Sequence, residues 1–115
     1  MVLPEKGHLL RIFVGESDKY DGIPLYEWII HKARQNSLAG ATVIRGIEGY
    51  GAHSRIHTSK ILRLSEDLPV IIEIVDTLEK IEKFMPLIDE AVKEGLATIE
   101  KVDIRFYRSG QSKKD

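Results

Sequence analysis

Four stretches of the chain are rich in apolar, β-branched and aromatic residues and are bounded by turn-forming residues. They cover residues 8–15, 41–48, 68–75 and 96–107. Stretches of this length and composition predict buried β-strands. Pro69 fits this assignment because it stands near the start of its strand, where a missing backbone N–H is tolerated.

A segment between the first two strands repeats apolar residues at the spacing of an α-helix. It runs from Leu25, and its apolar face includes Trp28 and Ile29. Pro24 suits the first turn of a helix, where its missing N–H has no intrahelical partner. Gly40 is expected to end this helix, since glycine is the usual residue just beyond a helix C-terminus.

A second helix is predicted after the third strand, because apolar residues recur at helical spacing across residues 78–92. Asp76 and Glu79 have the spacing of an N-terminal capping pair. Gly95 is expected to end the helix. Pro86 lies inside it and is expected either to kink it or to end its first segment early.

The order strand, helix, strand, strand, helix, strand predicts an α+β fold of the ferredoxin-like βαββαβ type. In this sandwich, two helices cover one face of a four-stranded antiparallel sheet. Residues 1–108 are expected to form a single domain, and residues 109–115 a flexible polar tail. The connection at about 49–67 is much longer than a hairpin loop, and such lengths favour a functional role.

The strands carry apolar residues on both faces, as Leu10, Ile12 and Val14 alternate with Leu9 and Phe13. A lone domain with helices on one face would leave the other face polar and wet. The second face is therefore expected to pack against another copy of the chain.

Composition narrows the function classes. The formal net charge of −1 gives no bulk attraction to nucleic acid or to a membrane surface, so anion recognition requires local clusters of basic residues. The absence of cysteine excludes disulfides, thiol catalysis and thiolate metal sites. No apolar run approaches the length of a membrane span, so we expect no membrane insertion and a cytoplasmic location.

The segment after the second strand is the strongest candidate for a ligand site. Three glycines lie at and just after the end of the strand: Gly46, Gly49 and Gly51, the last two on either side of Tyr50. Glycine lets the backbone approach a ligand closely, and successive N–H groups can surround an anion. The alternative is a bulge and turn that only closes the strand.

Basic residues near these glycines extend the candidate site. Arg55 and Lys60 follow in the long loop and can offset phosphate charge. Arg45, Arg105 and Arg108 are further candidates, because the planar guanidinium suits phosphate and a second copy could bring the C-terminal segment to the loop. The alternative for the C-terminal arginines is ordinary solvated charge.

Three strings of the sequence resemble a bacterial and archaeal family of uncharacterised PII-like proteins, catalogued as the domain of unknown function numbered one hundred and ninety. They are residues 22–29, 39–51 and 68–75. This family is related to the PII signalling proteins, and the resemblance covers nearly the whole chain. It implies a homotrimer whose sheets line the centre and whose clefts between subunits bind an adenine nucleotide.

Within this resemblance, Gly49-Tyr50-Gly51 is similar to the base of the PII loop, and residues 105–110 are similar to its basic C-terminal segment. The turn at 93–97 departs from PII proteins because no lysine follows its glycine. Residues 52–63 hold no clear counterpart of the tyrosine that PII proteins modify. Nucleotide binding is thus implied more strongly than control by covalent modification.

These observations predict a non-enzymatic PII-like regulator. The expected ligand is ATP, ADP or AMP, with Mg²⁺ as a candidate companion ion and no required cofactor. Binding of the nucleotide would order the 50–65 loop. The ordered loop would then signal to a partner protein, either a transporter or an enzyme. One alternative is a metal-binding trimer that uses His53 and His57. Another is a small phosphate-ester hydrolase that depends on Arg55, although no catalytic constellation is evident.

Overall fold

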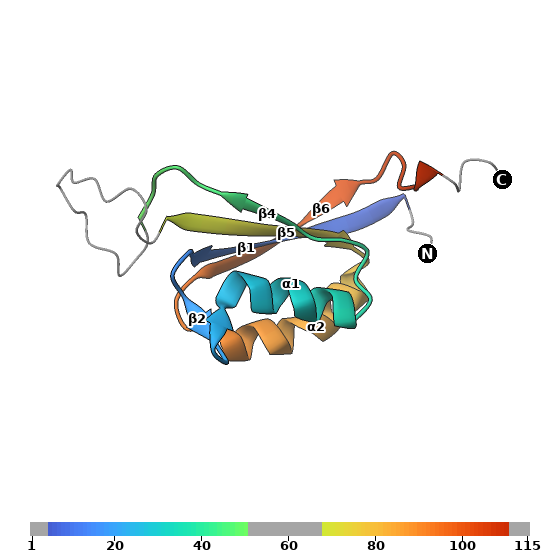
Figure 1. Cartoon of the computed structure of the whole chain (residues 1–115). Helices are drawn as coiled ribbons and strands as arrows, with labels where there is room; N and C mark the ends of the chain where they lie inside the picture. Colours follow the sequence, from blue (N-terminus) through green and yellow to red (C-terminus); the bar gives the residue numbers. More distant parts are fainter. Residues whose placement is uncertain (1–4, 51–67, 111–115) are drawn as a thin grey trace.

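Four strands form one antiparallel sheet in the order β4-β5-β1-β6 (Figure 1). The structure, a computed structural model, describes residues 5–50 and 68–110. The sheet strands are β1 (Lys6–Gly15), β4 (Thr42–Arg45), β5 (Pro69–Asp76) and β6 (Leu96–Asp103). Two short strands, β2 (Lys19–Tyr20) and β3 (Ile23–Pro24), form a hairpin before the first helix.

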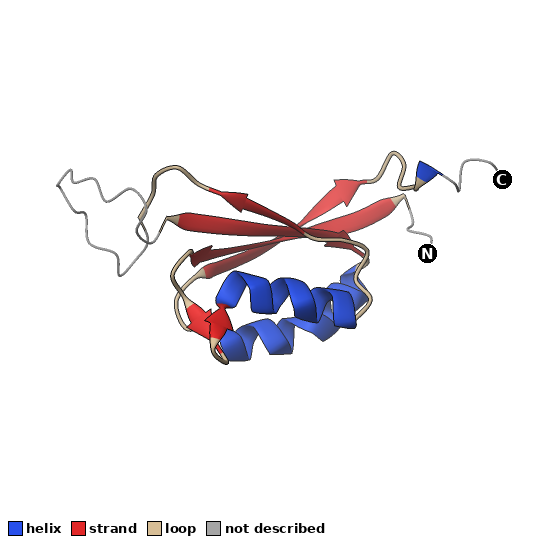
Figure 2. Ribbon diagram, in the orientation of Figure 1, coloured by secondary structure: helices blue, strands red, loops and turns tan. Residues whose placement is uncertain are grey.

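The helices α1 (Leu25–Gln35) and α2 (Leu78–Ala91) lie side by side on one face of the sheet (Figure 2). This arrangement confirms the predicted ferredoxin-like α+β fold. Neither helix of the described part of the chain is long and apolar enough to cross a lipid bilayer.

The core lies between the helices and the covered face of the sheet. Every second residue of β1 and β5 points to this side, since side chains alternate between the faces of a strand. From Leu10 to Val14 and from Val70 to Asp76 those residues are almost completely buried, and the apolar ones pack against the apolar stripes of both helices. Fully buried examples are Leu10, Ile12, Ile72, Ile29 and Ile81.

The strand predicted at 41–48 is shorter than expected, because β4 ends at Arg45. The Gly46 N–H still donates to the Pro69 carbonyl oxygen at 2.7 Å. Pro69 has no N–H to donate in return, so the ladder cannot continue past this pair. The prediction was wrong at this end of the strand.

The strand predicted at 96–107 is also shorter, because β6 ends at Asp103 opposite Lys6, the first residue of β1. One further bond, from the Ile104 N–H to the Glu5 carbonyl oxygen at 2.6 Å, closes this end. Residues 104–107 lie beyond the end of β6.

The predicted helix ends were wrong in detail. In α1 the last helical residue is Gln35, and Ser37 takes a left-handed conformation with φ 61° in place of the expected stop at Gly40. A bond from the Leu38 N–H to the Ala33 carbonyl at 3.1 Å completes this end. Such a reversed turn satisfies carbonyls that the helix leaves free.

The start of α2 differs from the predicted capping pair. Thr77 caps the helix, with its Oγ1 accepting from the Lys80 N–H at 3.2 Å, and Asp76 has another role. The helix continues through Pro86 and ends at Ala91, before Gly95. Gly95 is needed because a Cβ there would lie 2.5 Å from the Phe13 carbonyl oxygen.

Candidate functional site

The glycine-rich segment begins at the end of β4, at the left of Figure 1. Gly46 and Gly49 lie against the ring of Pro69: a Cβ added to Gly46 would lie 2.8 Å from its Cγ, and one added to Gly49 would lie 3.1 Å from it. These glycines therefore have a packing role that holds with or without a ligand. Tyr50 is 76% exposed at the base of the loop.

Arg45 is the last residue of β4, and its guanidinium forms an ion pair with the Glu16 carboxylate. The guanidinium remains mostly exposed, with 62% of the side chain accessible, whereas the Glu16 side chain is 22% accessible. Arg45 therefore lies beside the glycine turn, residues 46–50, and part of its charge is already balanced by Glu16.

Several predicted residues lie outside the described residues, and their roles remain predictions. They are Gly51, His53, Arg55, His57 and Lys60, together with nearly all of the 50–65 loop. Within the described ranges 5–50 and 68–110, no group of three or more His, Asp and Glu side chains is placed to hold a metal ion.

A groove of about 470 Å³ lies at the other end of the sheet, on the face that the helices leave open. Its volume falls within the range of about 300–1,000 Å³ that small-molecule sites occupy. Leu9, Val75 and Val102 supply apolar lining from three neighbouring strands. Residues 39–42 and 103–107 supply the rest of its wall, together with Glu73.

The wall of the groove is held together at Ala39, in the connection between α1 and β4. The Ala39 N–H donates to Oδ2 of Asp76 at 2.7 Å, and the Ala39 carbonyl accepts from the Tyr107 hydroxyl at 2.7 Å. The second oxygen of the buried Asp76 accepts from the Thr77 N–H, also at 2.7 Å. The backbone of one residue, Ala39, thus fixes the C-terminal segment to the start of α2.

The two C-terminal arginines differ in their surroundings. Arg105 lines the groove, and within the described part of the chain its guanidinium has no ion-pair or hydrogen-bond partner. Arg108 stacks on the Phe106 ring, with its Cζ 4.3 Å from the ring centroid. Among the described residues that line the groove, Arg105 is therefore the basic group available to an anion.

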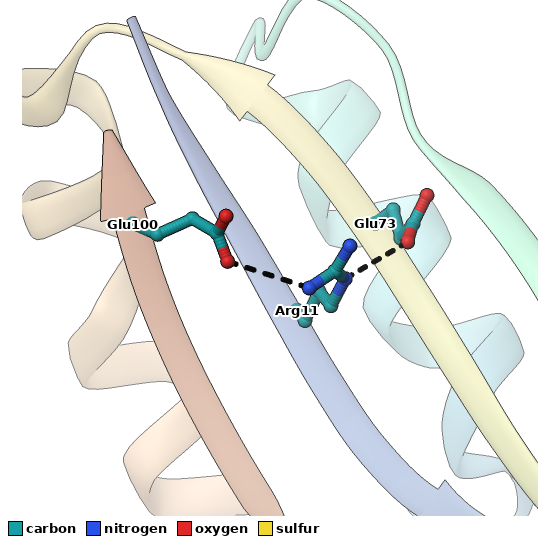
Figure 3. Close-up of polar contacts among 3 residues, drawn as sticks. All are labelled: Arg11, Glu73 and Glu100. Carbon is teal, nitrogen blue, oxygen red and sulfur yellow. Dashed lines mark hydrogen bonds and ion pairs between the residues drawn. The ribbon is translucent and has the colours of Figure 1, made fainter. Parts of the chain in front are cut away.

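Glu73 belongs both to the groove and to a cluster of charges on the open face (Figure 3). The Arg11 Nε donates to Oε2 of Glu73 at 3.0 Å, and the Arg11 Nη1 donates to Oε1 of Glu100 at 3.4 Å. Thr42 is the direct cross-strand partner of Glu73 and lines the same groove. A hydroxyl and a carboxylate therefore lie next to each other among apolar side chains.

The glycine turn lies at one end of the sheet, and Arg105 lies at the other end with the C-terminal wall of the groove. Lys6 pairs with Asp103 at the groove end of β1, whereas Gly15 pairs with Pro69 at the glycine end. The ten residues of β1 separate the two ends by about 30 Å at the rise of an extended strand. One copy of the chain cannot apply both groups of predicted residues to a single small ligand.

Sequence reasoning missed Glu73, Thr42 and Tyr107 as parts of the groove. The sequence did contain a signal for Glu73. It is the one charged residue in the strand at 68–75, and Arg11 is the one charged residue in 9–15. A charge in each of two adjacent strands indicates a pair on a shared face. The pairing register that brings Thr42 beside Glu73 has no comparable signal in the sequence.

Comparisons with known proteins agree with this architecture. Residues 7–104 match the family model described as "DUF190: Uncharacterized ACR, COG1993". A UPF0166 protein of Aquifex aeolicus is 40% identical over 101 residues, covering 88% of this chain and 95% of the relative. A UPF0166 protein of Methanocaldococcus jannaschii is 40% identical over 104 residues, covering 90% and 94%.

A solved structure with a similar fold is that of CPII, a nitrogen regulatory PII-like protein from Thiomonas intermedia K12, bound to ADP, AMP and bicarbonate. The TM-score is 0.57 at 14% identity, with 90% of this chain and 97% of CPII covered. At this identity the likeness shows a shared fold.

Proposed function

This chain belongs to the DUF190 family, and on that premise we propose that it is a PII-like regulator that binds an adenine nucleotide between copies of itself. The observation that carries the proposal is the groove on the open face of the sheet, where Arg105 lies beside an apolar lining and has no ion-pair or hydrogen-bond partner among residues 5–50 and 68–110. An apolar surface with a few polar groups and a guanidinium suits a flat base attached to phosphates.

The base enters the groove between the apolar lining and the aromatic side chains of Phe106 and Tyr107. Aromatic rings stack favourably on such a base. The phosphates extend toward Arg105 and toward the glycine turn of a second copy. The separation of about 30 Å between the two ends of one sheet supports a site shared by two copies.

A homotrimer fits the open face of the sheet. Four apolar side chains on this face are half-buried in the single chain, although neither α1 nor α2 covers them: Leu9, Phe13, Ile71 and Val75. Apolar side chains of this kind favour packing against another surface. A closed ring of copies covers each open face and brings the groove of one copy near the loop of its neighbour.

In this proposal the protein is a regulator without turnover. Nucleotide binding orders the 50–65 loop, which then presents a surface to a partner protein, a transporter or an enzyme. Adenine is the preferred base because CPII, which shares the fold, is bound to ADP and AMP. The nucleotide binds with or without Mg²⁺, and no other cofactor is required.

Isothermal titration with ATP, ADP and AMP, with and without Mg²⁺, tests this proposal on protein whose mass in solution is measured by light scattering. We expect a trimer that binds close to one nucleotide per chain. Arg105→Ala should weaken binding at least tenfold. Lys83→Ala, which removes an exposed cation on α2, should leave the affinity unchanged. A folded protein that binds none of the three nucleotides contradicts the proposal.

A further inference from the structure

One carboxylate oxygen of Glu73 has no hydrogen-bond partner in the part of the chain that the structure describes. Oε2 accepts from the Arg11 Nε at 3.0 Å, while Oε1 has no hydrogen-bond partner within the described residues. In Figure 3 the free oxygen points away from Arg11, toward the side of the sheet on which β4 pairs with β5. Glu73 lines the groove, so this oxygen is available to a ligand there.

We propose that Glu73 selects the base of the bound nucleotide by accepting a hydrogen bond from its exocyclic amino group. This inference rests on the proposed function and adds the residue that chooses among bases. An ionised carboxylate can only accept hydrogen bonds, so it pairs with the 6-amino group of adenine and leaves a base without that donor unmatched.

Arg11 acts as a positioning residue for this selection. Its guanidinium fixes one oxygen of Glu73 with a charge-assisted bond, which orients the other oxygen toward the groove. The Arg11 side chain is 38% accessible and that of Glu73 is 31% accessible, so both are partly shielded from water. Shielding matters because a polar group left unpaired after desolvation costs more than its hydrogen bond contributes.

The same geometry predicts what a neutral side chain would do. In Glu73→Gln the amide oxygen would face Arg11, which only donates, and the amide NH₂ would face the groove. A hydrogen-bond donor, the amide NH₂, then replaces the carboxylate acceptor at the groove. The variant should therefore lose its preference for a 6-amino group and gain affinity for a base with a 6-oxo group.

The test compares AMP with purine riboside 5′-monophosphate, which lacks only the 6-amino group, and with IMP, which carries a 6-oxo group. Wild-type protein should bind AMP at least tenfold more tightly than purine riboside 5′-monophosphate. Glu73→Gln should reduce this ratio at least fivefold and bind IMP more tightly than the wild type does. Arg11→Met should reduce the ratio as well, since Glu73 then lacks its orienting partner.

Glu90→Gln is the matched control, because this exposed carboxylate lies on α2 beyond the other face of the sheet. It should keep the wild-type ratio, and circular dichroism should show that every variant is folded. Equal affinities of the wild type for AMP and purine riboside 5′-monophosphate would overturn selection by Glu73 and leave nucleotide binding intact. Failure of the wild type to bind AMP, ADP and ATP would overturn both proposals.

Discussion

The two faces of the sheet share the same strands but carry different kinds of side chain. On the covered face, alternate residues of β1 and β5, such as Ile12 and Ile72, are completely buried beneath the helices. On the open face, half-buried apolar residues surround the cluster of Arg11, Glu73 and Glu100. The covered face stabilises the fold, whereas the charged cluster lies on the open face, where a ligand or another copy of the chain can reach it.

Neighbouring residues of β5 provide the sharpest test of this comparison. Ile72→Ala removes a fully buried side chain from the covered face and should lower the free energy of unfolding by about 4 kcal/mol. Ile71→Ala alters the open face and should cost about 1 kcal/mol in the folding of each chain, while it weakens assembly. Urea denaturation and light scattering measure the two effects. Equal losses of stability would contradict the distinction between the faces.

The second prediction concerns Asp76, a buried charged residue on the covered face. The carboxylate of Asp76 is fully buried and accepts two hydrogen bonds of 2.7 Å, from the N–H groups of Ala39 and Thr77. Asp76→Ala leaves both donors without this partner and should cost about 3 kcal/mol. Thermal denaturation measures the loss.

The control for Asp76 is Asp89→Ala, since Asp89 is exposed on α2. That change should stay within about 0.5 kcal/mol of the wild type. A loss below about 1 kcal/mol in Asp76→Ala would mean that water replaces the carboxylate in full.

The smallest expected effect lies at the edge of the open face. Tyr107→Phe removes the hydroxyl that donates to the Ala39 carbonyl at 2.7 Å and should cost about 1 kcal/mol. Amide exchange should become faster in residues 104–108 and stay unchanged in β1. Tyr26→Phe is the control, because the Tyr26 hydroxyl has no hydrogen-bond partner among the described residues. Equal exchange in both variants would show that this bond does not hold the groove wall.

The fold could be predicted because hydrophobic periodicity reports which residues are buried. The alternation in β1 and β5 and the apolar stripe of α2 gave the elements and their order directly. The ends of elements depend on partners far away in the sequence. β4 stops because Pro69 lies opposite Gly46, and β6 stops because β1 begins at Lys6.

The candidate site was predictable only in part. Arg105 was named from its residue type, and the structure places it in the groove. Asp76 had been assigned to the helix cap, yet it binds Ala39, which lies 37 residues away in the sequence. Glu73 and Thr42 become neighbours only through the register of β4 and β5. Tertiary pairing of this kind leaves no local periodicity to detect.

The central position of β1 has a consequence for the order in which the protein forms. β1 lies between β5 and β6, and Lys6 pairs with Asp103, 97 residues away. Contacts between residues so far apart require the closure of long loops, which slows folding. β1 therefore receives its second neighbour, β6, only after β4, β5 and both helices have been synthesised.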